Sequence, residues 1–233
     1  MLLENKTAII YGAGGAIGGA IARIFAREGA KVFLSGRTLS KVESVAEEIV
    51  AAGGTAEAFL VDALDEAAVE GHVAKVFEAT GRLDVSFNAI TAVPQPGTQG
   101  IPIAQLSVDA FIAPIILYMR SHFLTARAAA RRMAEQGSGV LLMNTPEPAR
   151  LGLTRVGGMG PAWAAHGGLE PEPLRGIRRQ QRPRNLHSVV RHAGDRDDRC
   201  RLRSPCRRHG HLPRAVPSLR RKPDASEALD QGL

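Results

Sequence analysis

The 233-residue chain contains only two cysteines, and it has no apolar run long enough to cross a membrane. Two cysteines are too few for a disulfide scaffold, and such a composition is typical of a reducing compartment. The amino terminus also lacks the charged start and the cleavage pattern of a secretory signal. We therefore expect a cytoplasmic protein without a membrane span.

Aromatic residues are scarce, and none occurs after residue 165. All seven Phe, both Tyr and the single Trp lie in residues 1–165. Charge changes at the same point: residues 1–165 contain 14 basic and 15 acidic side chains, whereas residues 166–233 contain 16 and 8. The net charge of +7 therefore belongs to the second segment. This break predicts a folded domain over residues 1–165 and a basic, disordered tail over residues 166–233.

Residues 1–165 alternate between short apolar runs and longer helical patterns. Strands are expected at residues 7–11, 31–35, 56–61, 84–88 and 139–144, and helices at residues 17–28, 39–52, 66–80 and 107–136. Strands separated by helices in this rhythm are typical of βαβ units. We therefore predict an α/β fold with a doubly wound, Rossmann-like parallel sheet.

A glycine cluster, GAGGAIGG at residues 12–19, joins the first predicted strand to the first predicted helix. Glycines there let the backbone approach a pyrophosphate, and the helix start supplies free N–H groups. The alternative is a tight turn that packs the helix on the sheet without a ligand. The first interpretation predicts a dinucleotide site that includes Gly12, Gly14, Gly15, Ala16, Ile17 and Gly18.

Residues 1–165 resemble the amino-terminal two thirds of a short-chain dehydrogenase/reductase. The first turn of that family reads T-G-x-x-x-G-x-G, and this chain has Tyr11, Gly12, Ala16 and Gly18 at the four specified positions. The leading Thr and the middle Gly are thus replaced. The resemblance implies a nicotinamide dinucleotide as cofactor.

Three further positions match the same family. The resemblance implies that Asp62 contacts the adenine and that Asn88 and Ala89, in place of the N-N-A-G stretch, shape the cofactor cleft. Arg37 follows the second strand, where an acidic residue would accept hydrogen bonds from the ribose of NAD. A guanidinium suits a phosphate instead, so we expect NADP, with NAD as the alternative. A solvated loop cation is the other interpretation of Arg37.

The catalytic positions of the family are occupied by other residue types. The family uses a Tyr as general acid/base, a Lys four residues later that lowers the pKa of this Tyr, and a Ser that orients the substrate. Met159 and Trp163 stand at the Tyr and Lys positions, and Thr145 or Pro146 stands at the Ser position. Tyr118 occupies the position of a helical Asn. The candidate catalytic hydroxyls are therefore Thr145 and Tyr118, although a Tyr in a long helix more often packs in the core.

The arginine-rich tail has three interpretations. Arginines could bind nucleic-acid phosphates, but the tail has no aromatic residue to stack on bases, so we do not expect nucleic acid as a partner. The second interpretation is a metal site, but the spacing of the candidate ligands does not match common zinc sites, and we expect none. These candidates are Cys200, Cys206, His209 and His211.

The third interpretation, which we favour, is a frame-shifted translation of a GC-rich gene. Out-of-frame reading yields Arg, Pro, Gly, Ala and His with few aromatics, as in this tail. A one-base shift permits residues 166–187 to read as a helix followed by an apolar strand. On this interpretation the sheet is incomplete at its C-terminal edge, and the strand at residues 139–144 is an uncovered edge.

The resemblance implies an oxidoreductase that transfers hydride between NAD(P) and a small carbonyl or alcohol, with the Tyr and Lys of the family missing from this chain. One alternative is a non-catalytic dinucleotide-binding or scaffold protein, and another is nucleic-acid binding through the tail. The family forms homo-oligomers, but the frame shift would remove elements of that interface.

Overall fold

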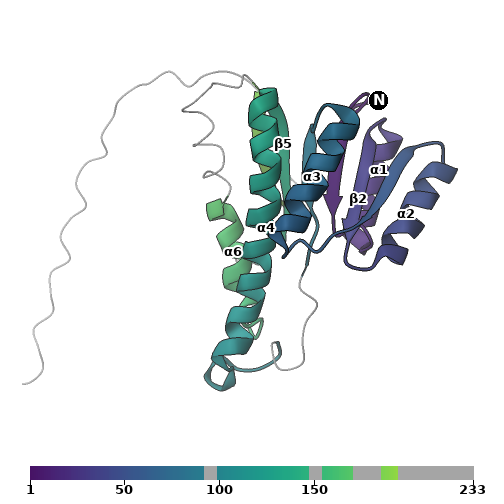
Figure 1. Cartoon of the computed structure of the whole chain (residues 1–233). Helices are drawn as coiled ribbons and strands as arrows, with labels where there is room; N and C mark the ends of the chain where they lie inside the picture. The colour runs from purple at the N-terminus through teal and green to yellow at the C-terminus, as the bar shows by residue number, and fades with distance from the viewer. Residues whose placement is uncertain (92–98, 147–153, 170–184, 194–233) are drawn as a thin grey trace, which may run out of the picture. The chain divides into compact units, whose positions relative to one another are not determined.

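The computed structural model describes residues 1–91, 99–146, 154–169 and 185–193. The chain divides into two compact units, Met1–Arg196 and Asp197–Leu233, and every described residue belongs to the first. This first unit is a parallel β-sheet with helices packed against it (Figure 1).

The strands of the sheet follow the order β3-β2-β1-β4-β5-β6, and each neighbouring pair is parallel. Their bounds are β1 Thr7–Tyr11, β2 Lys31–Gly36, β3 Thr55–Leu60, β4 Val85–Asn88, β5 Ser138–Pro146 and β6 Asn185–Ala193. The order changes direction between β1 and β4, which is where doubly wound sheets bind ligands. The predicted doubly wound parallel sheet is confirmed.

The helices are bounded by local signals, and both ends of α3 illustrate them. The helices are α1 Ala16–Arg27, α2 Leu39–Ala51, α3 Glu66–Thr80, α4 Val108–Gln136 and α6 Met159–Leu169, with a short 3-10 helix η1 at Ile103–Gln105. At the start of α3, the Asp65 carboxylate accepts hydrogen bonds from the N–H groups of Ala67 and Ala68. Gly81 ends α3 with a φ of 68°, a left-handed conformation that glycine adopts without strain.

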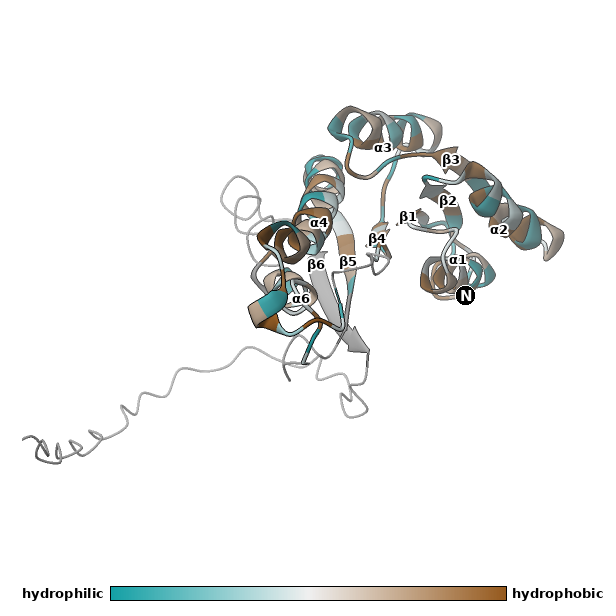
Figure 2. Cartoon of the chain, turned by 90° about the horizontal axis from the view of Figure 1, so that it is seen from below, coloured by the Kyte–Doolittle hydropathy of each residue, from teal (hydrophilic) through white to brown (hydrophobic). Residues whose placement is uncertain are grey.

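Two apolar cores lie on the two faces of the sheet. Alternate residues of β1 point to opposite faces, so Ile9 belongs to the core under α3 and α4, and Ile10 to the core under α1 and α2. Figure 2 shows α3 and α4 on one side of the sheet and α1 on the other. The amino-terminal half of α4 is strongly apolar in this view.

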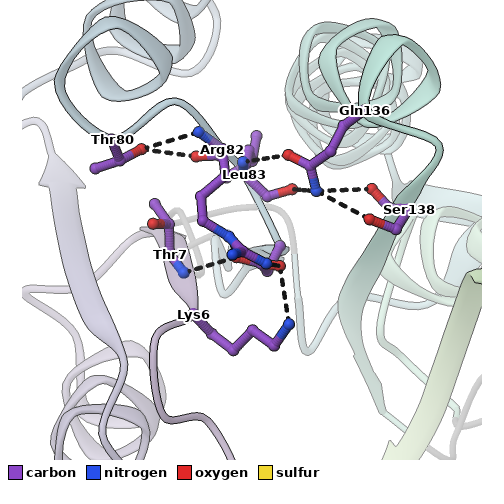
Figure 3. A network of polar contacts seen from close by, with 8 residues as sticks. Lys6, Thr7, Thr80, Arg82, Leu83, Gln136 and Ser138 are labelled. Atoms are coloured by element: carbon purple, nitrogen blue, oxygen red, sulfur yellow. Dashed lines mark hydrogen bonds and ion pairs between the residues drawn. The ribbon is translucent and has the colours of Figure 1, made fainter.

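A polar network ties strand starts together at the amino-terminal edge of the sheet (Figure 3). The Asp84 carboxylate, which precedes β4, accepts hydrogen bonds from the Thr7 N–H at 2.9 Å and from the Arg82 guanidinium at 2.6 and 2.7 Å. Lys6 Nζ lies 3.4 Å from the same carboxylate. Burial alone would raise the pKa of Asp84, but the Arg82 and Thr7 hydrogen bonds and the two cations hold it below its usual range.

Gln136 extends this network from β4 to β5. Its side-chain oxygen accepts from the Leu83 N–H at 2.9 Å, and its amide nitrogen donates to the carbonyl oxygens of Leu83 and Ser138 at 3.3 and 3.2 Å. The beginnings of three adjacent strands, β1, β4 and β5, are therefore joined by side chains.

Two expectations about the tail need correction. β6 pairs with β5 from Ser138↔Asn185 to Pro146↔Ala193, so β5 is not an uncovered edge. The tail was expected to be disordered from residue 166, but α6 continues to Leu169. α6 continues past residue 165 because His166 is buried and Leu169 packs against the core, and β6 forms because its backbone pairs with that of β5. The tail residues other than 166–169 and 185–193 lie outside the described residues, so the predicted incompleteness of the sheet beyond β6 is not described.

Candidate functional site

A cleft of about 490 Å³ opens where the strands of the first unit end. Its walls come from the segments that follow β1, β2, β3 and β4, together with residues of α4 and α6. Because these segments follow parallel strands, they meet at the carboxyl edge of the sheet, opposite the Asp84 network. The cleft therefore lies where the glycine cluster predicts a ligand site.

The turn after β1 has no room for side chains at two of its glycines. Gly12 has a φ of 74°, and a Cβ atom added to it would lie 3.2 Å from the Ala89 backbone. A Cβ atom added to Gly14 would lie 2.9 Å from the Lys41 Cβ. The turn lies between α2 and the segment after β4, and it presents backbone without side chains to the cleft.

The six predicted residues of this turn differ in position. Gly12, Gly14 and Gly15 line the cleft. Ala16 and Ile17 form the exposed first turn of α1, and Gly18 is buried where a side chain would collide with the Gly12 carbonyl. Gly15 precedes α1 without a side-chain cap, and the first turn of α1 contains no acidic residue. The N–H groups at this helix start therefore remain available to an anion.

Arg37 and Asp62, two candidate cofactor contacts from the sequence, both line the cleft. Arg37 is exposed directly after β2. The Asp62 carboxylate, after β3, accepts a hydrogen bond from the Leu64 N–H at 2.9 Å, which fixes its direction. The turn after β1 is anchored to β2 because the N–H groups of Gly12 and Ala13 donate to the Ser35 carbonyl at 2.9 and 3.1 Å.

Asn88 and Ala89 have separate roles. Ala89 lines the cleft, whereas Asn88 is buried behind it. The Asn88 amide donates to Thr125 Oγ1 at 2.9 Å, and its carbonyl oxygen accepts from the Ile90 N–H at 2.9 Å. Asn88 therefore holds the segment after β4 against α4, which positions the wall of the cleft.

The candidate catalytic residues are spread over different places. Met159 lies on the cleft wall and is only 6% exposed. Tyr118 is 2% exposed and packs against Met159 and Ala162, and it is not among the described residues that line the cleft. Thr145 lies in β5, where its backbone pairs in register with His192. Its side chain lies outside the described part of the structure.

A buried histidine pair stands beside Tyr118, and sequence reasoning missed it. His122 and His166 are fully buried, and their ring centroids lie 4.2 Å apart. Burial, followed by the nearby His166, lowers the pKa of His122 to about 3, and burial lowers the pKa of His166 to about 4. Both imidazoles are therefore neutral near pH 7. The sequence analysis placed His166 in the tail and His122 in the folded domain, so it did not predict that the two rings are in contact.

Ser121 is another residue of the cleft that the sequence analysis did not select. It lines the cleft from α4, and its hydroxyl donates to the Tyr118 carbonyl at 3.2 Å. Its place three residues after Tyr118 in one helix could have suggested a shared face.

A family model for short chain dehydrogenases matches residues 6–145 of this chain. The chain belongs to the short-chain dehydrogenase family. The match contains the glycine turn, Arg37, Asp62 and Asn88, and it ends at Thr145, before Met159 and Trp163.

Two curated bacterial oxidoreductases are similar to part of this short-chain dehydrogenase chain. An uncharacterised oxidoreductase of Bacillus subtilis is 34% identical over 139 residues, which cover 60% of this chain and 50% of that protein. The L-rhamnose 1-dehydrogenase (NAD(P)+) of Azotobacter vinelandii is 38% identical over 143 residues, which cover 60% and 54%. The chain thus spans about half the length of these relatives.

A solved relative matches a larger share of this short-chain dehydrogenase chain. A metagenomic short-chain oxidoreductase, crystallised in complex with NADP, superposes with a TM-score of 0.72 and 26% identity. The match covers 84% of this chain and 85% of that one.

No cluster of three or more His, Cys, Asp or Glu side chains within the described ranges could hold a metal ion. The Cys200 to His211 segment, the candidate metal site of the sequence analysis, lies outside those ranges. No described helix is both long and apolar enough to cross a membrane.

Proposed function

We propose that the chain binds NADP in the cleft and that its activity is hydride transfer between the nicotinamide and a small carbonyl or alcohol. The observation that carries this proposal is the bare glycine turn, whose Gly12 and Gly14 leave a cradle that any side chain would fill. Arg37 stands at the same cleft, and a guanidinium favours the 2′-phosphate that distinguishes NADP from NAD. The NADP in the metagenomic relative supports this choice.

The described residues fit the binding and orientation of such a cofactor. When bound, the dinucleotide supplies or accepts the hydride. The open start of α1 would hold its pyrophosphate, Arg37 its 2′-phosphate and Asp62 its adenosine, since all three lie at the cleft or its edge. Asn88 holds the wall after β4 in place through Ile90 and Thr125. NAD remains the alternative cofactor.

A second candidate function is dinucleotide binding without turnover. It is favoured by Met159, because a thioether on the cleft wall cannot give the proton that carbonyl reduction requires. Nucleic-acid binding has no support in the described residues, because the arginine-rich segment lies outside them.

NADPH fluorescence titration of the full chain tests the binding step. Gly14→Ala should raise the dissociation constant for NADPH about tenfold, equal to about 1.4 kcal/mol, because the new Cβ pushes the turn against Lys41. Gly71→Ala is the matched control, since nothing lies within 4 Å of a Cβ atom added there. Wild-type protein that fails to bind NADPH and NADH would refute both candidate functions.

Absorbance at the nicotinamide band, followed with a panel of small carbonyls and alcohols, separates the two candidates. Turnover supports the oxidoreductase. Tight NADPH binding with no turnover across the panel supports the non-catalytic protein instead.

A further inference from the structure

The lining of the cleft changes along the order of the strands. Its charged side chains, Arg37, Lys41 and Asp62, follow β2 or β3 or lie at the start of α2. The segment after β4, together with α4 and α6, forms the other side. Because β1 lies between β2 and β4 in the sheet, the glycine turn after β1 separates the two sides. A dinucleotide whose adenosine lies at Arg37 therefore extends toward α4 and α6.

The side of the cleft at α4 and α6 is lined by apolar side chains. Ala113, Pro114 and Leu117 line it from α4, and Met159 lines it from α6. Residues three or four apart share one face of a helix, so Leu117 lies on the same face as the two residues one turn before it. Figure 2 shows this half of α4 as strongly apolar. The helix thus presents an apolar stripe to the cleft.

The polar residues on this side are few and uncharged in the part of the chain that the structure describes. They are Thr91, Gln99 and Ser121. Ser121 lies one turn after Leu117 and is buried, and its hydroxyl already donates to the Tyr118 carbonyl at 3.2 Å. A carboxylate or phosphate placed here would meet no described cation, and added hydroxyl groups would compete for few partners.

We propose that the substrate is an apolar compound with a single carbonyl group, or the matching secondary alcohol, whose alkyl groups pack against Leu117 and Met159. The proposal rests on the proposed function, because the α4 and α6 side receives the nicotinamide when the adenosine lies at Arg37. Alkyl groups gain free energy when this wall removes them from water. A hydroxylated or charged analogue loses its hydration there without gaining equivalent partners.

The test measures the binding of small ketones to the NADPH complex of the full chain, so it does not depend on turnover. Diethyl ketone and dihydroxyacetone have the same shape, with methyl groups in the first where the second has hydroxyls, and α-ketobutyrate carries a carboxylate. Titrations followed by NADPH fluorescence should show that diethyl ketone binds at least about tenfold more tightly than either of the others. The reason is that an apolar wall leaves the added polar groups without partners.

Leu117→Gln tests whether the stripe of α4 sets this preference. The variant places an amide on the wall in a side chain of similar size, and the amide can hydrogen-bond a hydroxyl group. It should reduce the preference for diethyl ketone over dihydroxyacetone about fivefold and leave the dissociation constant for NADPH within about twofold. Ile116→Gln is the matched control, because Ile116 is the neighbouring residue, is 56% exposed and is not among the described residues that line the cleft.

The outcomes distinguish this proposal from the proposed function. Wild-type protein that does not bind NADPH overturns both. If NADPH binds but dihydroxyacetone or α-ketobutyrate binds as tightly as diethyl ketone, or none of the three binds, the substrate class is wrong and the cofactor assignment stands. A preference that Leu117→Gln leaves unchanged also overturns the proposal, because the ketone then lies away from α4. If Leu117→Gln no longer binds NADPH, the comparison of the three ketones on wild-type protein decides alone.

Discussion

At the scale of single residues, Met159 and Trp163 are the substitutions with the largest chemical consequence. Resemblance to the family places a general-acid Tyr and its supporting Lys at these positions. Met159 lies on the cleft wall, and Trp163 is half-buried against the Tyr118 cluster behind it. The glycine turn, Arg37 and Asp62 line the cleft, whereas the positions that the resemblance assigns to proton transfer carry Met159 and Trp163.

Replacing both residues should create proton transfer at the cleft. We expect the double variant Met159→Tyr with Trp163→Lys to reduce small carbonyls about a hundredfold faster than wild type, because a positioned general acid contributes about that factor. NADPH absorbance at saturating carbonyl measures the rate. Met159→Phe with Trp163→Lys is the control, since it matches the ring without the phenol. A double variant that binds NADPH as wild type does, yet shows no gain in rate, would contradict the expectation.

At the scale of helices and strands, the sequence predicted β1 to β5 and α1 to α4, because each has an apolar period and an end signal of its own. Asp65 and Gly81, for example, mark the two ends of α3. β6 was missed because Asn185–Ala193 lies in a basic, arginine-rich segment and pairs with β5, about 47 residues earlier. No local pattern encodes such a pairing.

The candidate site was predictable where a motif belongs to one turn. The alternation of strands and helices alone predicts that residues which follow strand ends lie together at one edge of the sheet. Such residues are Gly12, Gly14 and Arg37, and all three line the cleft. Lys41 and His166 depend on which helix packs against which turn. Such contacts join distant parts of the chain, and no periodicity reports them.

The packing of α6 on α4 should make stability depend on pH. Folding lowers the pKa of His166 from 6.5 to about 4, so the unfolded chain binds more protons in that range. The free energy of unfolding therefore carries no penalty from His166 above pH 6.5. As the pH falls from 6.5 toward 4, this free energy decreases by about 1.4 kcal/mol per pH unit. His166→Leu should flatten this dependence on pH. It should also raise the free energy of unfolding by about 1 kcal/mol and the melting temperature by a few degrees, because it removes two ring nitrogens that have no hydrogen-bond partner in the described residues.

Urea unfolding at pH 4.5, 5.5 and 6.5 measures this dependence. Burial also lowers the pKa values of His122 and His72, and this effect remains in the variant, so part of the slope must remain. An unchanged slope together with a lower melting temperature would show that the His166 ring contributes favourable packing instead.

At the scale of the whole molecule, charge and ligand site belong to different parts of the chain. The described residues that line the cleft lie between Tyr11 and Met159, where acidic and basic residues nearly balance. The net charge of +7 comes from residues 166–233. The frame-shift interpretation of the tail stays a prediction, which the coding DNA near codon 166 would test.

Removing residues 197–233 should leave NADPH binding intact. We expect the dissociation constant to change less than about twofold, because every described residue that lines the cleft is retained. Fluorescence titration of the shortened and full chains at equal salt measures this. A tenfold weakening would mean that the removed segment contributes to the site.

The Asp84 network has a consequence for how the molecule can change over time. Its contacts join Thr7, Asp84, Gln136 and Ser138 at one edge of the sheet, and the cleft opens at the other. Substitutions such as Met159 can therefore alter the chemistry at one edge without touching the ties at the opposite edge. A scaffold divided in this way tolerates the loss or replacement of a catalytic residue while its architecture persists, so inheritance of the fold and inheritance of the reaction are separable.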